Sequence, residues 1–217
     1  ARGAAIALGN FDGVHLGHQA VIESARLIAE ARGAALGAAI FEPHPRRFFQ
    51  PDAPPFRLQT NAQRARALGD AGVQEVFEIG FDAALAKSSD RDFAEKLLKG
   101  ALGAGHISVG DDFRFGRGRM GDVASLAKFG EEFGFTVEAI APGGGDDGAR
   151  VASTAIREAI LAGDMAAAAA MLTRPWAIEG AVQRGFQRGR GFGFPTANLS
   201  LGAYVRPRLG IYAVRVD

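Results

Sequence analysis

Short apolar runs alternate with longer stretches of helical spacing over roughly the first two thirds of the chain. The apolar runs are typical of buried strands, and they lie at residues 4–8, 35–41, 73–81, 106–110 and 135–141. Helical patterns between these runs predict helices over 16–32, 64–72, 90–105 and 122–134. Gly33 follows the first of these helices as an expected C-terminal cap, and Ser89 precedes the third as an expected N-cap.

Strands that alternate with helices favour an α/β fold, in which a Rossmann-like parallel sheet is wound by right-handed crossovers. In such sheets, ligands bind at the carboxyl ends of the strands. The unusual residues of this sequence gather in the loops where those ends are expected, at 9–18, 42–55, 110–121 and 142–154. The last of these loops contains "PGGGDDG", which is typical of a flexible linker.

The chain changes character near residue 173, where strand-like segments and glycine-rich turns replace the helical patterns. The segment "GIYAVRVD" (210–217), for example, has a residue pattern typical of a strand. We therefore predict a first domain over residues 1–172 and the start of a β domain, incomplete here, over residues 173–217.

Composition narrows the function classes. The 217 residues carry a net charge of +1 and include no cysteine. The balanced charge gives no reason to expect nucleic-acid or membrane binding, and the missing thiols exclude disulfides and thiolate metal sites. No apolar stretch approaches the ~20 residues needed to cross a bilayer, and no signal peptide is recognisable. A cytoplasmic protein, monomeric or weakly homo-oligomeric, is expected.

The stretch "GNFDGVHLGH" (9–18) has the highest density of special residues, with His15 and His18 placed where a strand ends and a helix begins. Free N–H groups and the positive end of the helix dipole would lie beside both imidazoles, which favours phosphate binding. Gly17 would leave room for a ligand against the first helical turn, and Gly9 would allow a tight loop before it. Two other interpretations of the histidines remain: they could bind a metal, although further ligands are hard to find, or one of them could cap the helix or pack in the core.

The stretch "STAIREAI" (153–160) combines a second expected helix start with a cation. Ser153 or Thr154 can cap this helix, and Arg157 lies one turn further along. This arrangement suits a second phosphate subsite, although a simple capped amphipathic helix shows the same pattern. Asp12, in the first loop, is equally consistent with helping to hold Mg²⁺ and with ordering the loop.

Aromatic residues and prolines mark two more loops. In "GDDFRFGRGRMGD" (110–122), Phe113 and Phe115 could wall a planar heterocycle while Asp112 accepts a hydrogen bond from its edge. Burial of either phenylalanine under the loop is the alternative. In "FEPHPRRFF" (41–49), the prolines predict an extended path, and Phe41 stands at a strand end.

The stretch "FPTAN" (194–198) suggests separate chemistry, because Thr196 and Asn198 offer oxygen ligands on one face of an extended segment. Such hard oxygen ligands suit a nucleotide-bound Mg²⁺.

Together, these motifs resemble those of the bacterial bifunctional riboflavin kinase/FAD synthetases. "GNFDGVHLGH" resembles the HxGH signature of the nucleotidylyltransferases in the form found in that family. "FEPHP", "VGDDFRFGRGRMGD" and "STAIREAI" resemble its later motifs in order, and "GRGFGFPTANL" resembles the opening of its riboflavin kinase module.

This resemblance implies an FMN adenylyltransferase domain followed by the start of a β-barrel kinase domain. The implied reaction joins FMN and ATP to give FAD and pyrophosphate with Mg²⁺, and riboflavin with ATP is the implied substrate pair of the kinase module. Since that module is incomplete here, we expect no kinase activity from this stretch. Many relatives have a serine where Ala152 stands, so a hydrogen bond is expected to be absent there.

The roles that the resemblance implies fall on four groups of residues. The reacting phosphates would be met by His15, His18 and Arg157, and ATP by Gly9, Phe11, Asp12, Gly17, Ser153 and Thr154. The flavin would be met by Phe41, Asp112, Phe113 and Phe115, and the kinase-module ATP and Mg²⁺ by Gly193, Thr196 and Asn198. The alternative functions are adenylyl transfer to another phosphorylated acceptor and a non-catalytic flavin- or nucleotide-binding module.

Overall fold

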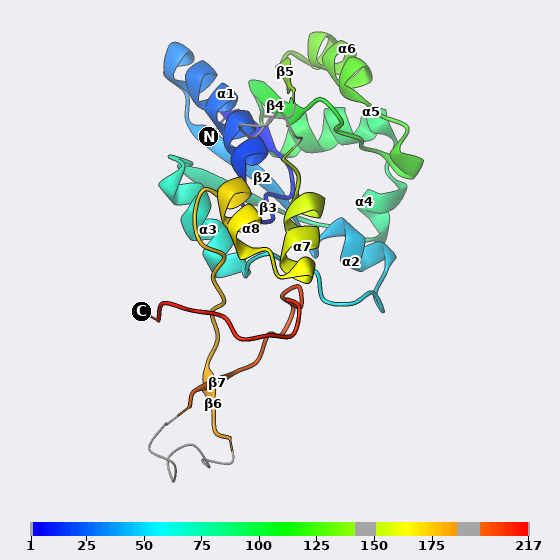
Figure 1. The fold of residues 1–217 in the computed structure, drawn as a ribbon. Helices are drawn as coiled ribbons and strands as arrows, with labels where there is room; N and C mark the ends of the chain where they lie inside the picture. The colour runs from blue at the N-terminus through cyan, green and yellow to red at the C-terminus, as the bar shows by residue number, and fades with distance from the viewer. Residues whose placement is uncertain (1, 142–150, 186–195, 217) are drawn as a thin grey trace.

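A five-stranded parallel sheet forms the centre of the computed structural model, which describes residues 2–141, 151–185 and 196–216 (Figure 1). The strands are β1 (Ala5–Leu8), β2 (Leu36–Glu42), β3 (Glu75–Gly80), β4 (His106–Gly110) and β5 (Thr136–Ile140). They lie in the order β3-β2-β1-β4-β5, and every neighbouring pair is parallel. The predicted α/β fold is therefore confirmed.

Alternate residues of the strands face two helical layers. Ala5 and Ala7 pack toward α1 (Leu16–Arg32) and α3 (Asn61–Asp70), and their small side chains suit a close approach of α1. Ile6 and Leu8 pack on the other face toward η1 (Phe93–Ala101), a π-helix, and α6 (Val123–Phe133). Because both faces are covered there, the central strands β1 and β2 are buried along nearly their whole length, whereas the outer strands β3 and β5 combine exposed residues with partly or fully buried ones.

A third, smaller apolar cluster joins α7 (Ser153–Ala162) and α8 (Met165–Leu172) to Leu58 and Val205. Beyond α8 the chain leaves the helical body and forms a short antiparallel pair, β6 (Val182–Gln183) with β7 (Asn198–Leu199) (Figure 1). The remaining short elements are α2 (Pro45–Phe49), α4 (Ala83–Lys87), α5 (Asp90–Asp92) and the 3-10 turn η2 (Arg117–Arg119).

The expected helix ends are confirmed where local signals were strong. Helix α1 has the predicted bounds and ends at Gly33 in the left-handed region, with φ 59°. Ser89 caps the predicted third helix by accepting from the Asp92 N–H at 3.0 Å, although that helix is a short α segment followed by the π-helix η1.

Two expectations are wrong. The extended path predicted through Pro45 is instead the start of α2, with Pro45 in the first turn, where a missing N–H removes no helical hydrogen bond. Residues 210–216 form no strand, because within the described ranges no neighbouring strand pairs with them. The glycine-rich segment 142–148 lies outside the described residues.

Candidate active site

The strand order reverses between β1 and β4, and this is where an open parallel sheet forms its ligand crevice. The chain runs from β1 outward to β2 and β3 on one side, then returns to β4 and β5 on the other. Two of the loops identified in the sequence follow these central strands: residues 9–15, here called the glycine loop, and residues 111–121.

The glycine loop has an unusual backbone. Phe11 and Val14 adopt φ values of 49° and 43°, in the left-handed region that bulky and β-branched residues avoid. Gly13 between them has φ 104°, and a Cβ there would lie 2.9 Å from the Leu58 side chain. Residues held in such conformations cost on the order of 1–3 kcal/mol each, so the surrounding structure must hold the loop.

Side chains from other elements supply that support by donating to the loop carbonyls. Five consecutive carbonyl oxygens, from Asn10 to Val14, each accept a hydrogen bond from a side chain. The pairs are Asn10–Arg64 (3.3 Å), Phe11–Gln59 (2.9 Å), Asp12–Ser153 (2.9 Å), Gly13–Arg174 (2.6 Å) and Val14–Gln19 (3.0 Å). With its carbonyls engaged outward, the loop can present N–H groups to an anion, as backbone nests do.

His15 and His18 lie at the start of α1 with their rings stacked, 3.7 Å between centroids. His15 is the N-cap residue, and its Nδ1 accepts from the His18 N–H at 3.4 Å. The Nδ1 atom of His18 is buried and has no hydrogen-bond partner among the described residues. A buried polar atom without a partner is costly, so this nitrogen marks a place for a ligand.

Both imidazoles are neutral near pH 7. Burial, reinforced by Arg157 and Arg174, lowers the pKa of His15 to about 4. Burial, then His15 and Arg157, holds the pKa of His18 well below its usual value. Each ring therefore has one N–H to donate and no charge of its own before an anion arrives.

Asp12 orders the loop. Its side chain is 1% exposed; Oδ1 accepts from the Leu58 N–H at 3.0 Å, and Oδ2 accepts from Arg157 Nη2 at 2.6 Å. Both carboxylate oxygens thus already bind protein donors, which supports the loop-ordering role over the Mg²⁺ role. No group of three or more His, Cys, Asp or Glu side chains that could hold a metal occurs in the described part of the chain, so the two histidines have no third ligand for the metal site that the sequence left open.

Helix α7 meets the glycine loop at Asp12, but not by the predicted cap. Its N-cap is Ala152, whose methyl group cannot accept a hydrogen bond, so the helix has no side-chain cap at this position, as expected from the sequence. Ser153 is instead the first helical residue, and its hydroxyl donates to the Asp12 carbonyl. The predicted capping by Ser153 or Thr154 is therefore wrong, and Thr154 lies exposed in the first turn.

Arg157 and Gly17 connect α7 with the rest of the site. Arg157 donates from Nε to the Phe56 carbonyl at 2.7 Å, in addition to its ion pair with Asp12. A Cβ on Gly17 would lie 3.0 Å from the Val151 carbonyl, so α1 and the segment preceding α7 pack closely at this point. The positive ends of both helices consequently converge on the glycine loop.

The predicted flavin residues lie mostly in the core. Phe41 and Phe115 are 7% and 5% exposed, with ring centroids 6.3 Å and 5.1 Å from Phe93. For Phe115, this burial is the alternative foreseen from the sequence. Phe113 stacks on Phe115 at 5.6 Å and is half-buried, and Asp112 lies exposed beside it. Flavin binding by these four residues stays a prediction.

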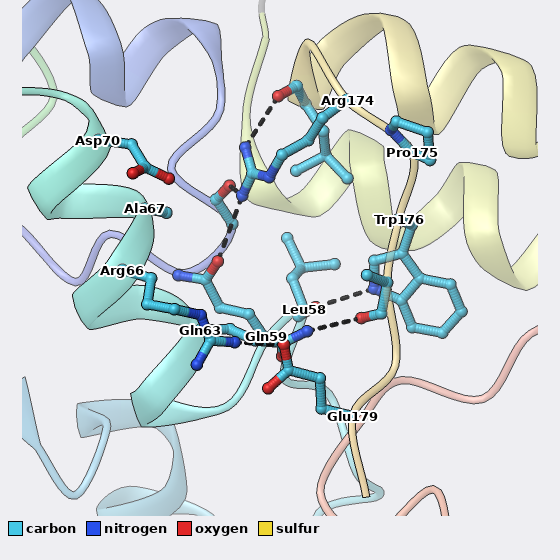
Figure 2. Close-up of a pocket in the computed structure, with 13 residues that line it drawn as sticks. Leu58, Gln59, Gln63, Arg66, Ala67, Asp70, Arg174, Pro175, Trp176 and Glu179 are labelled. Carbon is cyan, nitrogen blue, oxygen red and sulfur yellow. Dashed lines mark hydrogen bonds and ion pairs between the residues drawn. The ribbon is translucent and has the colours of Figure 1, made fainter. Parts of the chain in front are cut away.

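Gln59, which donates to the glycine loop, lines two hollows. One, of about 540 Å³, lies between segments 42–47, 56–62 and 203–204. His44 lines it, and burial together with Arg57 and Arg157 lowers the pKa of His44 to about 3. The other, of about 170 Å³, lies behind Gly13 between α3 and segment 172–179 (Figure 2).

The kinase-module residues are only partly described. Gly193 lies outside the described residues, and Thr196 and Asn198 are exposed, with Asn198 in β7 opposite Gln183. Their roles in holding ATP and Mg²⁺ stay predictions.

The sequence did not reveal the residues that support the loop, namely Gln19, Gln59, Arg64 and Arg174. Three of the four come from distant segments, up to 161 positions away for Arg174 and Gly13, so no local spacing could identify them. Gln19, five residues from Val14, lies on the predicted helix and was within reach of sequence reasoning.

A parallel sheet with an HLGH sequence at the first helix start defines a nucleotidylyltransferase of the α/β class. Comparison with known proteins agrees. The family model described as FAD synthetase matches residues 1–155, and the one described as riboflavin kinase matches residues 172–217. The chain belongs to the bifunctional riboflavin kinase/FAD synthetase family.

Curated relatives of this family match over nearly the whole chain. "Bifunctional riboflavin kinase/FMN adenylyltransferase" from Pseudomonas fluorescens is 43% identical over 100% of this chain and 69% of the relative. The protein of the same name from Escherichia coli K12 is 39% identical over 99% of this chain and 68% of the relative. The recognition made from the motifs is therefore confirmed, as is the assignment to an enzyme with nucleotidyltransferase activity.

A solved structure shows the same fold. It is titled "Crystal Structure of Macrolide-efflux Protein from Streptococcus pneumoniae" and matches with a TM-score of 0.84 and 28% identity, covering 96% of this chain and 68% of its own. The efflux function in that title is said of that protein alone. Within the described ranges of this chain, no helix is long and apolar enough to cross a membrane.

Proposed function

We propose that the glycine loop and the starts of α1 and α7 bind the phosphates of ATP, and that this site transfers AMP to FMN. The observation that carries the proposal is the buried, unpartnered His18 Nδ1 at the point where both helices begin. Loop N–H groups and two neutral imidazoles there suit an anion better than any cation or apolar ligand.

The reaction needs orientation and charge stabilisation more than proton transfer. An oxygen of the FMN phosphate attacks the α-phosphorus of ATP, the bond to the bridging α–β oxygen breaks, and its electron pair leaves with pyrophosphate. Because the attacking oxygen is already anionic, no general base is required. Catalysis then rests on holding the groups in line and on neutralising charge as it moves toward the leaving group.

Each residue has a role consistent with its contacts. His15 and His18 donate to the phosphates, and the arriving negative charge raises the pKa of both rings, which strengthens them as donors. Arg157 uses Nε and Nη2 for Phe56 and Asp12, which leaves Nη1 for the pyrophosphate beside Ser153 and Thr154. Gly9 and Gly17 would lie against ATP, whereas Phe11 is 1% exposed and would meet it only through its backbone.

Magnesium would enter this site with the ATP substrate. Because both Asp12 carboxylate oxygens already bind protein donors, the ion would be held mostly by the substrate phosphates and by water. No step of the reaction is therefore assigned to a protein-held metal.

The remaining assignments extend the same proposal. The isoalloxazine ring would lie against Phe113 and Asp112, at the surface of the aromatic cluster with Phe41 and Phe115. Residues 173–217 would belong to the riboflavin kinase module, with Gly193, Thr196 and Asn198 at its ATP and Mg²⁺ site. A cytoplasmic location and a monomer or weak homo-oligomer fit a small-molecule enzyme of this kind.

Replacement of one histidine tests the proposal. We expect His18→Ala, made in the full chain, to lower the rate of FAD formation from FMN and ATP by about 10²-fold or more. The FAD formed would be measured by chromatography. His106→Gln is the control: it removes a histidine at the start of β4, at the amino-terminal ends of the strands and away from the site, and retains a hydrogen-bonding side chain. Equal rates for His18→Ala and the wild type would reject the site, and FMN binding by the wild type without turnover would favour a non-catalytic module.

A further inference from the structure

Arg174 reaches the glycine loop from the segment that follows α8. Its Nη2 donates to the Gly13 carbonyl at 2.6 Å and lies 3.4 Å from Gln59 Oε1, while Nη1 donates to the Leu172 carbonyl at 3.0 Å (Figure 2). The residue as a whole is exposed, but its guanidinium group is turned inward to the cavity behind Gly13.

Gln59 extends this contact to a second loop carbonyl. It is 4% exposed, and its Nε2 donates to the Phe11 carbonyl at 2.9 Å. Arg174 and Gln59 therefore support the carbonyls on both sides of Asp12, in the stretch where Phe11, Gly13 and Val14 all have positive φ values.

The neighbouring residues hold Arg174 in place. Trp176 donates from its indole Nε1 to the Leu58 carbonyl at 2.8 Å, and Gln63 Nε2 donates to the Ala177 carbonyl at 3.0 Å. Segment 174–177 is thus attached along the same stretch of chain, near residues 58–63, that supports the glycine loop (Figure 2).

We propose that Arg174 is a positioning residue for adenylyl transfer, which holds the glycine loop in the strained conformation that orients His15. The inference rests on the proposed function of the site. Arg174 lies outside the 1–155 match to the FAD synthetase model and inside the 172–217 match to the riboflavin kinase model. The adenylyltransferase site is accordingly completed by a residue from the segment that the kinase model matches.

The physical basis is the position of His15 directly after the strained Val14. Without Arg174 the Gly13 carbonyl loses its side-chain donor, and the peptides around Val14 can relax from φ 43°. Such a relaxation moves the His15 ring, and a displacement of about 1 Å in a catalytic group can cost on the order of 10²-fold in rate.

The test compares Arg174→Ala, Arg174→Lys and Arg66→Ala in the full chain. Arg66 lines the same cavity but is exposed and pairs with Glu179, so its loss should leave the loop unchanged. We expect Arg174→Ala to lower kcat for FAD formation by roughly 10- to 100-fold, with less than about a three-fold change in the KM for FMN. Arg174→Lys should recover much of the rate, because an ammonium group can still donate to the Gly13 carbonyl.

Two further readouts separate positioning from a general loss of structure. Titration with a non-hydrolysable ATP analogue should give the wild-type number of sites in Arg174→Ala, with Trp176 fluorescence unchanged. Amide hydrogen exchange of residues 11–15 should be faster in Arg174→Ala and unchanged in Arg66→Ala.

The results that overturn the inference are distinct from those that overturn the function. A wild-type kcat in Arg174→Ala, a fall in kcat that only matches a loss of binding sites, or unchanged exchange of the loop each overturns positioning by Arg174. A wild-type chain that forms no FAD from FMN and ATP overturns the proposed function, whatever the exchange experiment shows.

Discussion

Replacement of Asp12 by asparagine separates the two roles that its sequence left open. In the structure the carboxylate is almost fully buried and accepts from the Leu58 N–H at 3.0 Å and from Arg157 Nη2 at 2.6 Å. The asparagine side chain would retain one acceptor for the Leu58 N–H, but its neutral amide would remove the charge opposite Arg157. We therefore expect Asp12→Asn to destabilise the fold more than to alter metal dependence.

The magnitude follows from the Arg157 ion pair. A hydrogen bond to a charged group contributes about 1.5–3 kcal/mol, and removal of one partner of a buried ion pair costs about 3–5 kcal/mol. The Arg157 side chain is 13% exposed and keeps its bond to the Phe56 carbonyl, so a loss of about 2–3 kcal/mol is expected. For a chain of this size that corresponds to a fall in Tm of roughly 5–10 °C.

Thermal and urea denaturation of the full chain, with and without MgCl₂, provide the assay. A double-mutant cycle with Arg157→Gln should show a coupling of about 1–3 kcal/mol, since the two side chains lose the same contact. An unchanged Tm in Asp12→Asn, together with a large rise in the Mg²⁺ concentration needed for FAD formation, would refute loop ordering and make Asp12 a metal ligand.

Two other predictions concern the same loop. The pKa of His15 falls from 6.5 to about 4 on folding, so between these pH values the unfolded chain binds a proton that the folded chain does not. Protonation of His15 in the unfolded chain should therefore lower the free energy of unfolding by up to about 3 kcal/mol as the pH falls from 6.5 to 4. Urea midpoints across that range should be less pH-dependent in His15→Asn, and parallel curves would contradict the assignment. Gly13→Ala should cost more than about 2 kcal/mol, because its Cβ would meet Leu58 at 2.9 Å in addition to the strain of φ 104°. Gly33→Ala is the control, because Gly33 also has a positive φ but a Cβ there would meet no atom within 4 Å; it should lower the free energy of unfolding by about 1 kcal/mol. Equal losses in the two variants would show that the contact with Leu58 does not matter.

The sheet and the first helix were predictable because their signals are local. Apolar runs of strand length and the spacing of residues 16–32 are complete within a few turns of chain, and Gly33 ends the helix by its own conformational freedom. The start of α2 was not predicted, because a proline is compatible both with an extended path and with the first turn of a helix. Tertiary packing decides between the two.

The candidate site was predictable in its residues but not in its geometry. The histidines stand at a strand end that the sequence marks clearly, so their common location followed from topology. The left-handed conformations of Phe11 and Val14 had no local signal, because neither residue favours them. They depend on donors such as Gln59 and Arg174, which lie 48 and 161 positions from the carbonyls they meet.

Burial is the main reason that the histidines of the site are neutral before a ligand binds, because it lowers the pKa of each one, and the surrounding arginines add to this effect. Arg157 contributes to the lowered pKa of both His15 and His44. Arg174 also acts on His15, and Arg46, Arg57 and Arg64 also act on His44. The carboxylates beside these arginines are those of Asp12 and Glu42, and that of Asp70 near Arg174.

These five arginines outnumber the three carboxylates, so the site holds an excess of positive charge that a triphosphate would neutralise. As negative charge builds on the phosphates and the leaving group, the arginines cease to oppose protonation of the imidazoles, and the donors strengthen where the charge develops. Groups that stabilise the transition state more than the free enzyme are those that raise the rate. Burial and the neighbouring arginines thus lower the pKa of the histidines in the free protein, and phosphates that neutralise those arginines would strengthen the same histidines as donors.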